Sequence, residues 1–171
     1  LEAQREEITA QRNLATQQRD EIAQREKEIM DSIYYAKRIQ TAIMPAANVI
    51  NSVLENFILF RPRDIVSGDF YYFKQIGPYA IIVAADCTGH GVPGACMSML
   101  GSAYINEIVT SHQDALNSGE ILDLLRESVI ESLNQTGRVD EAKDGMDIAL
   151  CILNLETREL EFSGAFNPMY I

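Results

Sequence analysis

The chain has 171 residues, of which 47% are hydrophobic and 23% are charged, and its net charge is −11 at pH 7. This length is enough for one domain with a sizeable core and an appendage, and the composition is that of a soluble globular protein. The acidic balance disfavours nucleic acid and anionic membrane surfaces as partners, and no run of 18 apolar residues is present to span a membrane.

The three cysteines are Cys87, Cys96 and Cys151, and none has the spacing of a metal site. Each lies in an apolar stretch, so we expect reduced thiols in a cytoplasmic protein. The chain begins without Met and without a signal-peptide pattern, and it stops inside an expected strand, so we interpret it as an excerpt of a longer protein.

Residues 1–45 predict one long helix, because glycine and proline are absent until Pro45. One seam position of a coiled coil recurs every seven residues, at Leu1, Ile8, Ala15, Ile22, Ile29, Ala36 and Ile43. The partner position is polar at first, at Gln4, Gln11, Gln18 and Arg25. We therefore expect a weak coiled coil that pairs in a homodimer and joins an upstream sensor domain to residues 46–171. A solvated helical spacer is the alternative.

Residues 46–171 alternate between strand and helix patterns. Strands are expected at 56–62, 69–76 and 79–86, with a Gly77-Pro78 turn between the last two. Helices are expected at 93–112 and 119–135 from their apolar spacing. A hairpin at 147–166 and a further strand from 167 complete the pattern. Because the strand connections are short, the fold expected is an α+β one, with a mostly antiparallel sheet layered with helices.

Two aspartates stand at expected strand ends beside glycines. Asp86 ends the apolar run 79–85 and precedes a glycine-rich turn, whereas Asp69 follows Gly68 at the start of its strand. The hairpin between them brings the two ends together, and hard divalent ions prefer such oxygen ligands. The small residues leave room for backbone carbonyls to approach. A turn or cap role is the alternative for each acid, since Asp beside Gly is common in turns.

Other chemistries fit the same stretch less well. A zinc site at His90 lacks further ligands at suitable spacing. No serine has the surroundings of a nucleophile elbow, and Gly89-His90-Gly91 is not followed by the Gly-Lys-Ser/Thr of a phosphate-binding loop. A nucleotide cyclase also pairs two acids behind a coiled coil, but this acidic chain offers no basic clamp for a triphosphate.

Four segments together resemble the bacterial serine phosphatases of the sporulation and sigma-factor-regulator type, a branch of the metal-dependent protein phosphatase 2C family. They are SIYYAKRIQTAIMP, RPRDIVSGDFYYF, AADCTGHGVPGACMSMLG and GMDIALCILNLETRELEFSGAFNP, in order over residues 31–171. The resemblance implies a phosphatase 2C-like β-sandwich layered with helices, and a regulatory linker before it.

The resemblance also implies residue roles. Two Mn²⁺ or Mg²⁺ ions would share carboxylates of Asp69 and Asp86, and the backbone carbonyl of Cys87 would be a further ligand. His90 matches a family histidine and would protonate the leaving serine oxygen. The substrate implied is a phosphoserine or phosphothreonine on a partner protein, for example an anti-anti-sigma-type regulator.

This chain departs from the family pattern in two places. Tyr72 replaces a common aspartate, and two further metal-binding aspartates of the family lie beyond the point where this sequence ends. Asp147 matches neither of them. We therefore expect weak metal binding and little turnover from this excerpt, and a catalytically inactive dimeric signalling module is the alternative to an enzyme.

Overall fold

The computed structural model describes residues 2–111, 117–138 and 144–170. It divides into two compact units, Leu1–Tyr35 and Ala36–Ile171. The elements in chain order are helices α1 (Glu2–Ile43) and α2 (Ala47–Asn51), strands β1 (Phe70–Ile76) and β2 (Tyr79–Cys87), helices α3 (Gly91–Ser111) and α4 (Ser118–Ser132), and strands β3 (Met146–Asn154) and β4 (Leu160–Ala165). Residues 1, 112 and 171, which belong to expected elements, lie outside the described residues.

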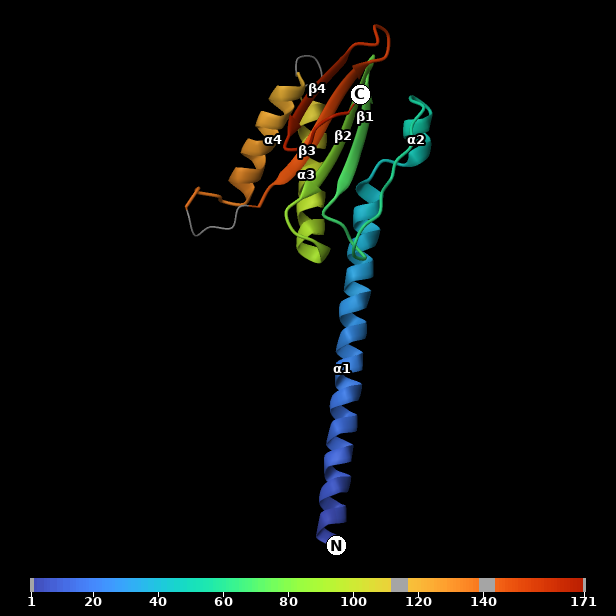
Figure 1. The fold of residues 1–171 in the computed structure, drawn as a ribbon, viewed down its shortest axis with the longest axis vertical. Coiled ribbons are helices and arrows are strands. Elements are labelled where there is room, and N and C mark those ends of the chain that lie inside the picture. The colour runs from blue at the N-terminus through green and yellow to red at the C-terminus, as the bar shows by residue number, and fades with distance from the viewer. Residues whose placement is uncertain (1, 112–116, 139–143, 171) are drawn as a thin grey trace. The chain divides into compact units, whose positions relative to one another are not determined.

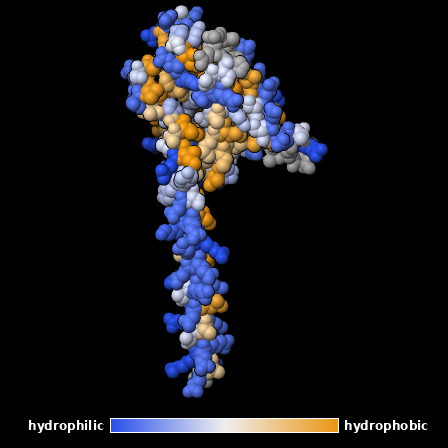
Figure 2. Space-filling model, turned by 180° about the vertical axis from the view of Figure 1, so that it is seen from behind, coloured by the Kyte–Doolittle hydropathy of each residue, from blue (hydrophilic) through white to orange (hydrophobic). Residues whose placement is uncertain are grey.

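Helix α1 confirms the expected long N-terminal helix. It ends before Pro45, whose ring disfavours helical backbone in the residue that precedes it. Ile8, Ile22 and Ile29 are each more than half exposed, and hydrophobic residues recur along one edge of the helix in Figure 2. An isolated helix with an exposed apolar edge gains little stability from burial, so this pattern favours a partner helix.

The strands form one antiparallel sheet in the order β1-β2-β3-β4. The expected hairpin at 69–86 is present, and its turn contains Gly77 at φ +55°. The β3–β4 hairpin is also as expected, with a turn that includes Arg158 at φ +65°. The α+β class, the antiparallel sheet and the long helix are therefore confirmed, and the described residues supply a single four-stranded sheet.

The strand expected at 56–62 is not formed. This segment pairs with none of the four strands, and Phe57 and Leu59 are 92% and 75% exposed. The alternation of its side chains is real, but a strand needs a neighbour to bond with, and the described residues provide none for it. After β4, Phe166 makes a single bridge with Ile148, and residues 167–170, where we expected a further strand, form none.

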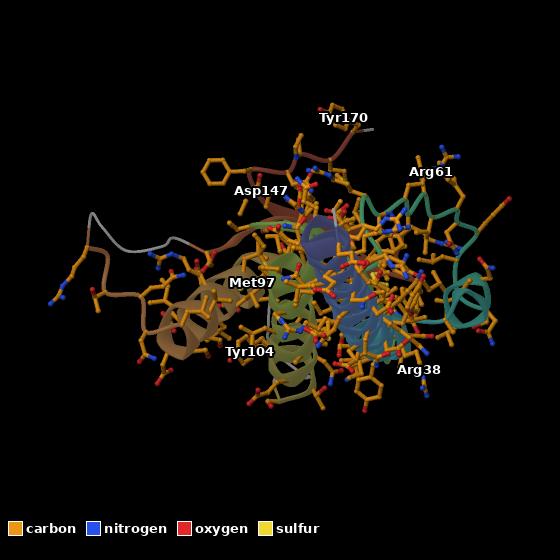
Figure 3. The ribbon with its side chains drawn as sticks, turned by 90° about the horizontal axis from the view of Figure 1, so that it is seen from below. Arg38, Arg61, Met97, Tyr104, Asp147 and Tyr170 are labelled. Atoms are coloured by element: carbon orange, nitrogen blue, oxygen red, sulfur yellow. The ribbon has the colours of Figure 1, made fainter. Side chains whose placement is uncertain are left out.

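Helices α3 and α4 cover one face of the sheet and enclose the main core (Figure 1). Ile105, Ile121 and Leu150 are at most 1% exposed there. Figure 3 shows Met97 and Tyr104 between the two helices, and the Tyr104 hydroxyl bonds to Ser132 on α4. Helix α4 begins with a capping box, in which Asn117 and Glu120 each bond to the other's backbone N–H. The core thus fixes the strands that carry both aspartates.

The opposite face of the sheet carries a smaller cluster. Ile50 of α2 packs with Phe73 and Ala80, and Val53 and Leu54 extend the contact. In the described residues, no helix is both long and apolar enough to cross a membrane.

Candidate metal centre

Asp69 and Asp86 lie side by side at one end of the sheet. The register pairs Phe70 with Ala85, so Asp69 lies one step further along, opposite Asp86. Directly opposed residues in an antiparallel pair project their side chains on the same face, a few ångströms apart. Burial raises the pKa of Asp69 most. A hydrogen bond with the Asp86 carboxyl and the negative charge of Asp86 raise it further. The expected convergence of these two acids is therefore present in the structure.

Both carboxylates line one cavity of about 520 Å³. It is lined by the first residues of β1, the last residues of β2 and the segment 56–61, which includes Arg61. Asn167 also lines it. The segment that forms no strand thus closes one side of this cavity. A pair of like charges in a hollow is unfavourable without a cation, and this arrangement attracts one.

Three glycines allow the two aspartate-bearing segments to touch through their backbones. A β-carbon on Gly94 would lie 2.5 Å from the carbonyl oxygen of Gly89, and one on Gly68 would lie 2.8 Å from the same atom. Gly89 itself has φ +90°, which side chains disfavour. The turn after Asp86 is therefore rich in glycine because side chains there would prevent the close approach of the two backbone segments.

Cys87 contributes its backbone rather than its thiol. The side chain is buried in the core, and burial, with the charges of Asp86 and Asp69, raises its pKa to about 12, so the thiol stays protonated. Its carbonyl oxygen lies 3.1 Å from the position of a Gly68 β-carbon, beside the loop that leads to Asp69. Cys87 is not among the residues that line the aspartate cavity, so its expected carbonyl role stays a prediction.

The turn after β2 is fixed to the start of β3. The Thr88 N–H donates to the Gly145 carbonyl at 2.9 Å, and the Gly145 N–H donates to the Thr88 hydroxyl at 3.1 Å. Two residue pairs inward, Asp147 lies directly opposite Asp86. Figure 3 shows Asp147 on the sheet side, away from α3 and α4. Sequence comparison with the family gave Asp147 no role, and only the register reveals its place beside the aspartate pair.

Gln40, at the end of α1, holds the loop before Asp69. Its amide nitrogen donates to the Ser67 carbonyl at 2.6 Å and to the Ser98 hydroxyl at 2.7 Å, and its amide oxygen accepts from the Ser67 N–H at 3.0 Å. The Ser67 hydroxyl in turn accepts from the Asp69 N–H at 3.0 Å. Gln40 is 4% exposed. The sequence analysis missed it, although a glutamine on the inward-facing side of an otherwise apolar stripe is a usable signal.

His90 is not among the residues that line the aspartate cavity. Its Nδ1 lies 3.0 Å from Oδ2 of Asp64, a residue that no sequence pattern singled out. Tyr72, by contrast, is among the residues that line this cavity, and its hydroxyl donates to Asn106 of α3 at 3.2 Å. Burial raises the pKa of Tyr72 to about 12. The residue that replaces the common family aspartate thus lies in the wall of the aspartate cavity.

The donors fit a hard divalent cation in type but form an incomplete set. Asp69, Asp86 and the Cys87 carbonyl are all oxygen ligands, as Mg²⁺ and Mn²⁺ prefer. Within the described residues, no group of three or more His, Cys, Asp or Glu side chains is arranged to hold a metal ion. The expectation that this excerpt lacks part of the metal-binding carboxylates stays a prediction.

Comparison with solved structures finds a match to the "SiaA-PP2C domain of Pseudomonas aeruginosa", with 35% sequence identity and a TM-score of 0.70. The match covers 82% of this chain and 55% of that one, so the chain spans about half the length of the structure it resembles. Neither the protein-family models nor the curated proteins gave a match. The chain therefore has a PP2C-like fold, and its paired aspartates lie at the end of the sheet in that fold.

Proposed function

We propose that this chain is part of a metal-dependent protein serine/threonine phosphatase in bacterial signalling, of the sporulation and sigma-factor-regulator type. The observation that carries the proposal is the meeting of Asp69 and Asp86 in a cavity of a PP2C-like fold. Its substrate is a phosphoserine or phosphothreonine on a regulatory partner protein, for which an anti-anti-sigma-type regulator is the expectation.

Each residue has a role in this proposal. Asp69, Asp86 and the Cys87 carbonyl hold Mn²⁺ or Mg²⁺, and the complete domain binds two ions. When bound there, such cations would supply activation of water and neutralisation of charge on the phosphoryl oxygens. The proximity of the two carboxyls supports this assignment, since burial and then a hydrogen bond with Asp86 raise the pKa of Asp69. His90 donates a proton to the leaving serine oxygen.

The linker helix regulates this site through Gln40, which we propose as the point of coupling. Its amide bonds to both backbone groups of Ser67, two residues before Asp69. A shift of this helix segment would move Ser67 and, through the Ser67 hydroxyl, the backbone of Asp69. Homodimerisation through the coiled coil is the proposed source of such a shift. Gln40 also bonds to Ser98 of α3, so the same shift would reach the helix that follows the Asp86 turn.

The test is Mn²⁺-dependent phosphate release from a phosphoserine peptide by the full-length gene product. Asp86→Asn is expected to abolish release, whereas Asp123→Asn, an exposed acid on α4, serves as the matched control and retains it. Residues 1–171 alone are expected to bind Mn²⁺ weakly and to show little turnover, because their donor set is incomplete.

A second candidate function is a non-catalytic dimeric signalling module with the same fold. The observation that favours it is the absence, in the part of the chain that the structure describes, of a complete set of metal ligands. A folded full-length protein that releases no phosphate from several phosphopeptides with Mn²⁺, yet still dimerises, would support the module over the enzyme.

A further inference from the structure

A carboxylate–histidine pair joins the two segments that carry the aspartates. Nδ1 of His90 lies 3.0 Å from Oδ2 of Asp64. Asp64 precedes Asp69 by five residues, and His90 follows Asp86 by four. The pair therefore lies on the same two segments as the candidate metal centre, although His90 does not line the aspartate cavity.

Stability does not account for this pair. The side chains of His90 and Asp64 are 67% and 40% exposed, and exposed ion pairs contribute only about 0–1 kcal/mol. What the contact determines is the state of the ring. An ionised carboxylate only accepts hydrogen bonds, so Asp64 requires a hydrogen on Nδ1. This leaves the opposite nitrogen, Nε2, as the one whose proton can be exchanged with a ligand.

Nε2 of His90 has no hydrogen-bond partner among the described residues. It therefore remains available at the surface, where the side chain of a protein substrate would approach. The backbone around it is well defined. Gly91 has φ +62°, and a β-carbon there would lie 3.7 Å from Oδ2 of Asp64. Asp64 itself lies three residues before Ser67, which Gln40 holds at both backbone groups.

We infer that Asp64 is a positioning residue that orients His90 for proton donation from Nε2. The inference rests on the proposed phosphatase function. As the water oxygen bonds to phosphorus and the bond from phosphorus to the serine oxygen breaks, the Nε2 proton moves to the serine oxygen and the two protons of the water leave with the phosphate product. The ring is left neutral, and its Nδ1–H remains bonded to Asp64. The carboxylate thus stabilises the charged ring before transfer and keeps the neutral ring in the same orientation afterwards.

The test compares two substrates in the full-length gene product with Mn²⁺. A phosphoserine peptide needs a proton on its leaving oxygen, whereas p-nitrophenyl phosphate leaves as a stable phenolate and does not. Asp64→Asn is expected to lower kcat on the peptide about tenfold, and His90→Gln at least as much, since general acid catalysis contributes about 10²–10⁴-fold. On p-nitrophenyl phosphate each loss should stay below about threefold. The double variant should be no worse than His90→Gln alone, and Asp123→Asn is the control.

A merely structural role for Asp64 predicts a different result, namely equal losses on both substrates. Equal losses, or no loss on the peptide, would overturn the inference. A wild-type protein that is inactive on both substrates contradicts the proposed function itself, and the inference falls with it. The comparison of the two substrates therefore distinguishes a wrong role for Asp64 from a wrong proposal of phosphatase activity.

Ring-nitrogen NMR of the metal-free protein gives a readout that does not depend on activity. With ¹⁵N-labelled histidine, and with His90→Gln to assign the signals, wild-type neutral His90 is expected to carry its proton on Nδ1. In Asp64→Asn the proton should shift toward Nε2, the nitrogen that free histidine prefers. A ring that already carries its neutral-form proton on Nε2 in the wild type would contradict the role of Asp64.

Discussion

The two units of the chain obtain their stability in different ways. In residues 2–35 nearly every side chain is exposed, and the contacts that are present are local, such as Gln17 with Glu21 and Gln24 with Glu28. In residues 36–171 the sheet and two helices enclose a continuous core. We therefore expect the first unit to depend on a partner helix, whereas the second has a core of its own. Changes in the first should alter association, and changes in the second should alter folding and the site.

The largest effect is expected at the coiled-coil seam. Ile22→Lys combined with Ile29→Lys places four lysines in the seam of a dimer, and burial of each isoleucine there is worth about 1.5–3 kcal/mol. We expect the dimer to dissociate in analytical ultracentrifugation, with the far-UV spectrum of residues 36–171 retained. Ala23→Lys with Met30→Lys adds the same charge one position away from the seam and should leave the dimer intact. If both pairs of changes act equally, the seam assignment is wrong.

The next effect tests the core of the second unit. Leu150→Ala removes a side chain with 0% exposure from β3, and such cavities cost about 2–5 kcal/mol. Urea unfolding should show this loss in the free energy of unfolding. Ile8→Ala in the first unit removes a comparable aliphatic side chain that is 56% exposed, and below the dimer dissociation constant it should cost little. A similar cost at both positions would remove the contrast between the two units.

Gln40→Ala tests the link between α1 and the site at an intermediate magnitude. It leaves the Ser67 N–H without its partner, while the Ser67 carbonyl keeps only the Ser98 hydroxyl, at a cost of about 1–3 kcal/mol. We expect a lower unfolding midpoint and a higher Mn²⁺ concentration for half-maximal activity in the full-length gene product. Lys37→Ala, an exposed residue on the same helix, is the control. A loss of stability with an unaltered Mn²⁺ requirement would show that Gln40 stabilises the fold but does not couple α1 to the metal site.

The smallest effect concerns the charge of the aspartate pair without metal. Because the pKa of Asp69 is raised in the fold, the native state binds its proton more tightly than the unfolded state does. Stability therefore falls as pH rises through the raised pKa. In EDTA, Asp69→Asn should be more stable than wild type at neutral pH, by less than about 1 kcal/mol after solvent screening. The difference should vanish at acidic pH, and Mn²⁺ should stabilise wild type only. A destabilised variant would contradict this account.

Local pattern predicted the hairpins and the aspartate pair. Strand alternation around Gly77-Pro78 fixes which residues oppose each other, and so places Asp69 opposite Asp86. The segment 56–62 has a similar pattern but forms no strand, because pairing depends on a neighbour that a local pattern cannot reveal.

Residues brought in by tertiary structure were not predicted. Gln40 meets Ser67 across 27 positions, and Asp64 meets His90 across 26. Asp147 lies opposite Asp86 only through the β2–β3 register, after two intervening helices. Each has an ordinary surface-type side chain in the sequence, and only the fold gives it a position near the site.

The central claim is that Asp69 and Asp86 form a metal centre, and calorimetric titration of the full-length gene product with Mn²⁺ tests it most directly. Wild type and Asp123→Asn should bind with the same affinity, and Asp69→Asn and Asp86→Asn should each weaken binding at least tenfold. Binding that is undiminished in both site variants, or absent from a folded wild-type protein, would contradict the claim.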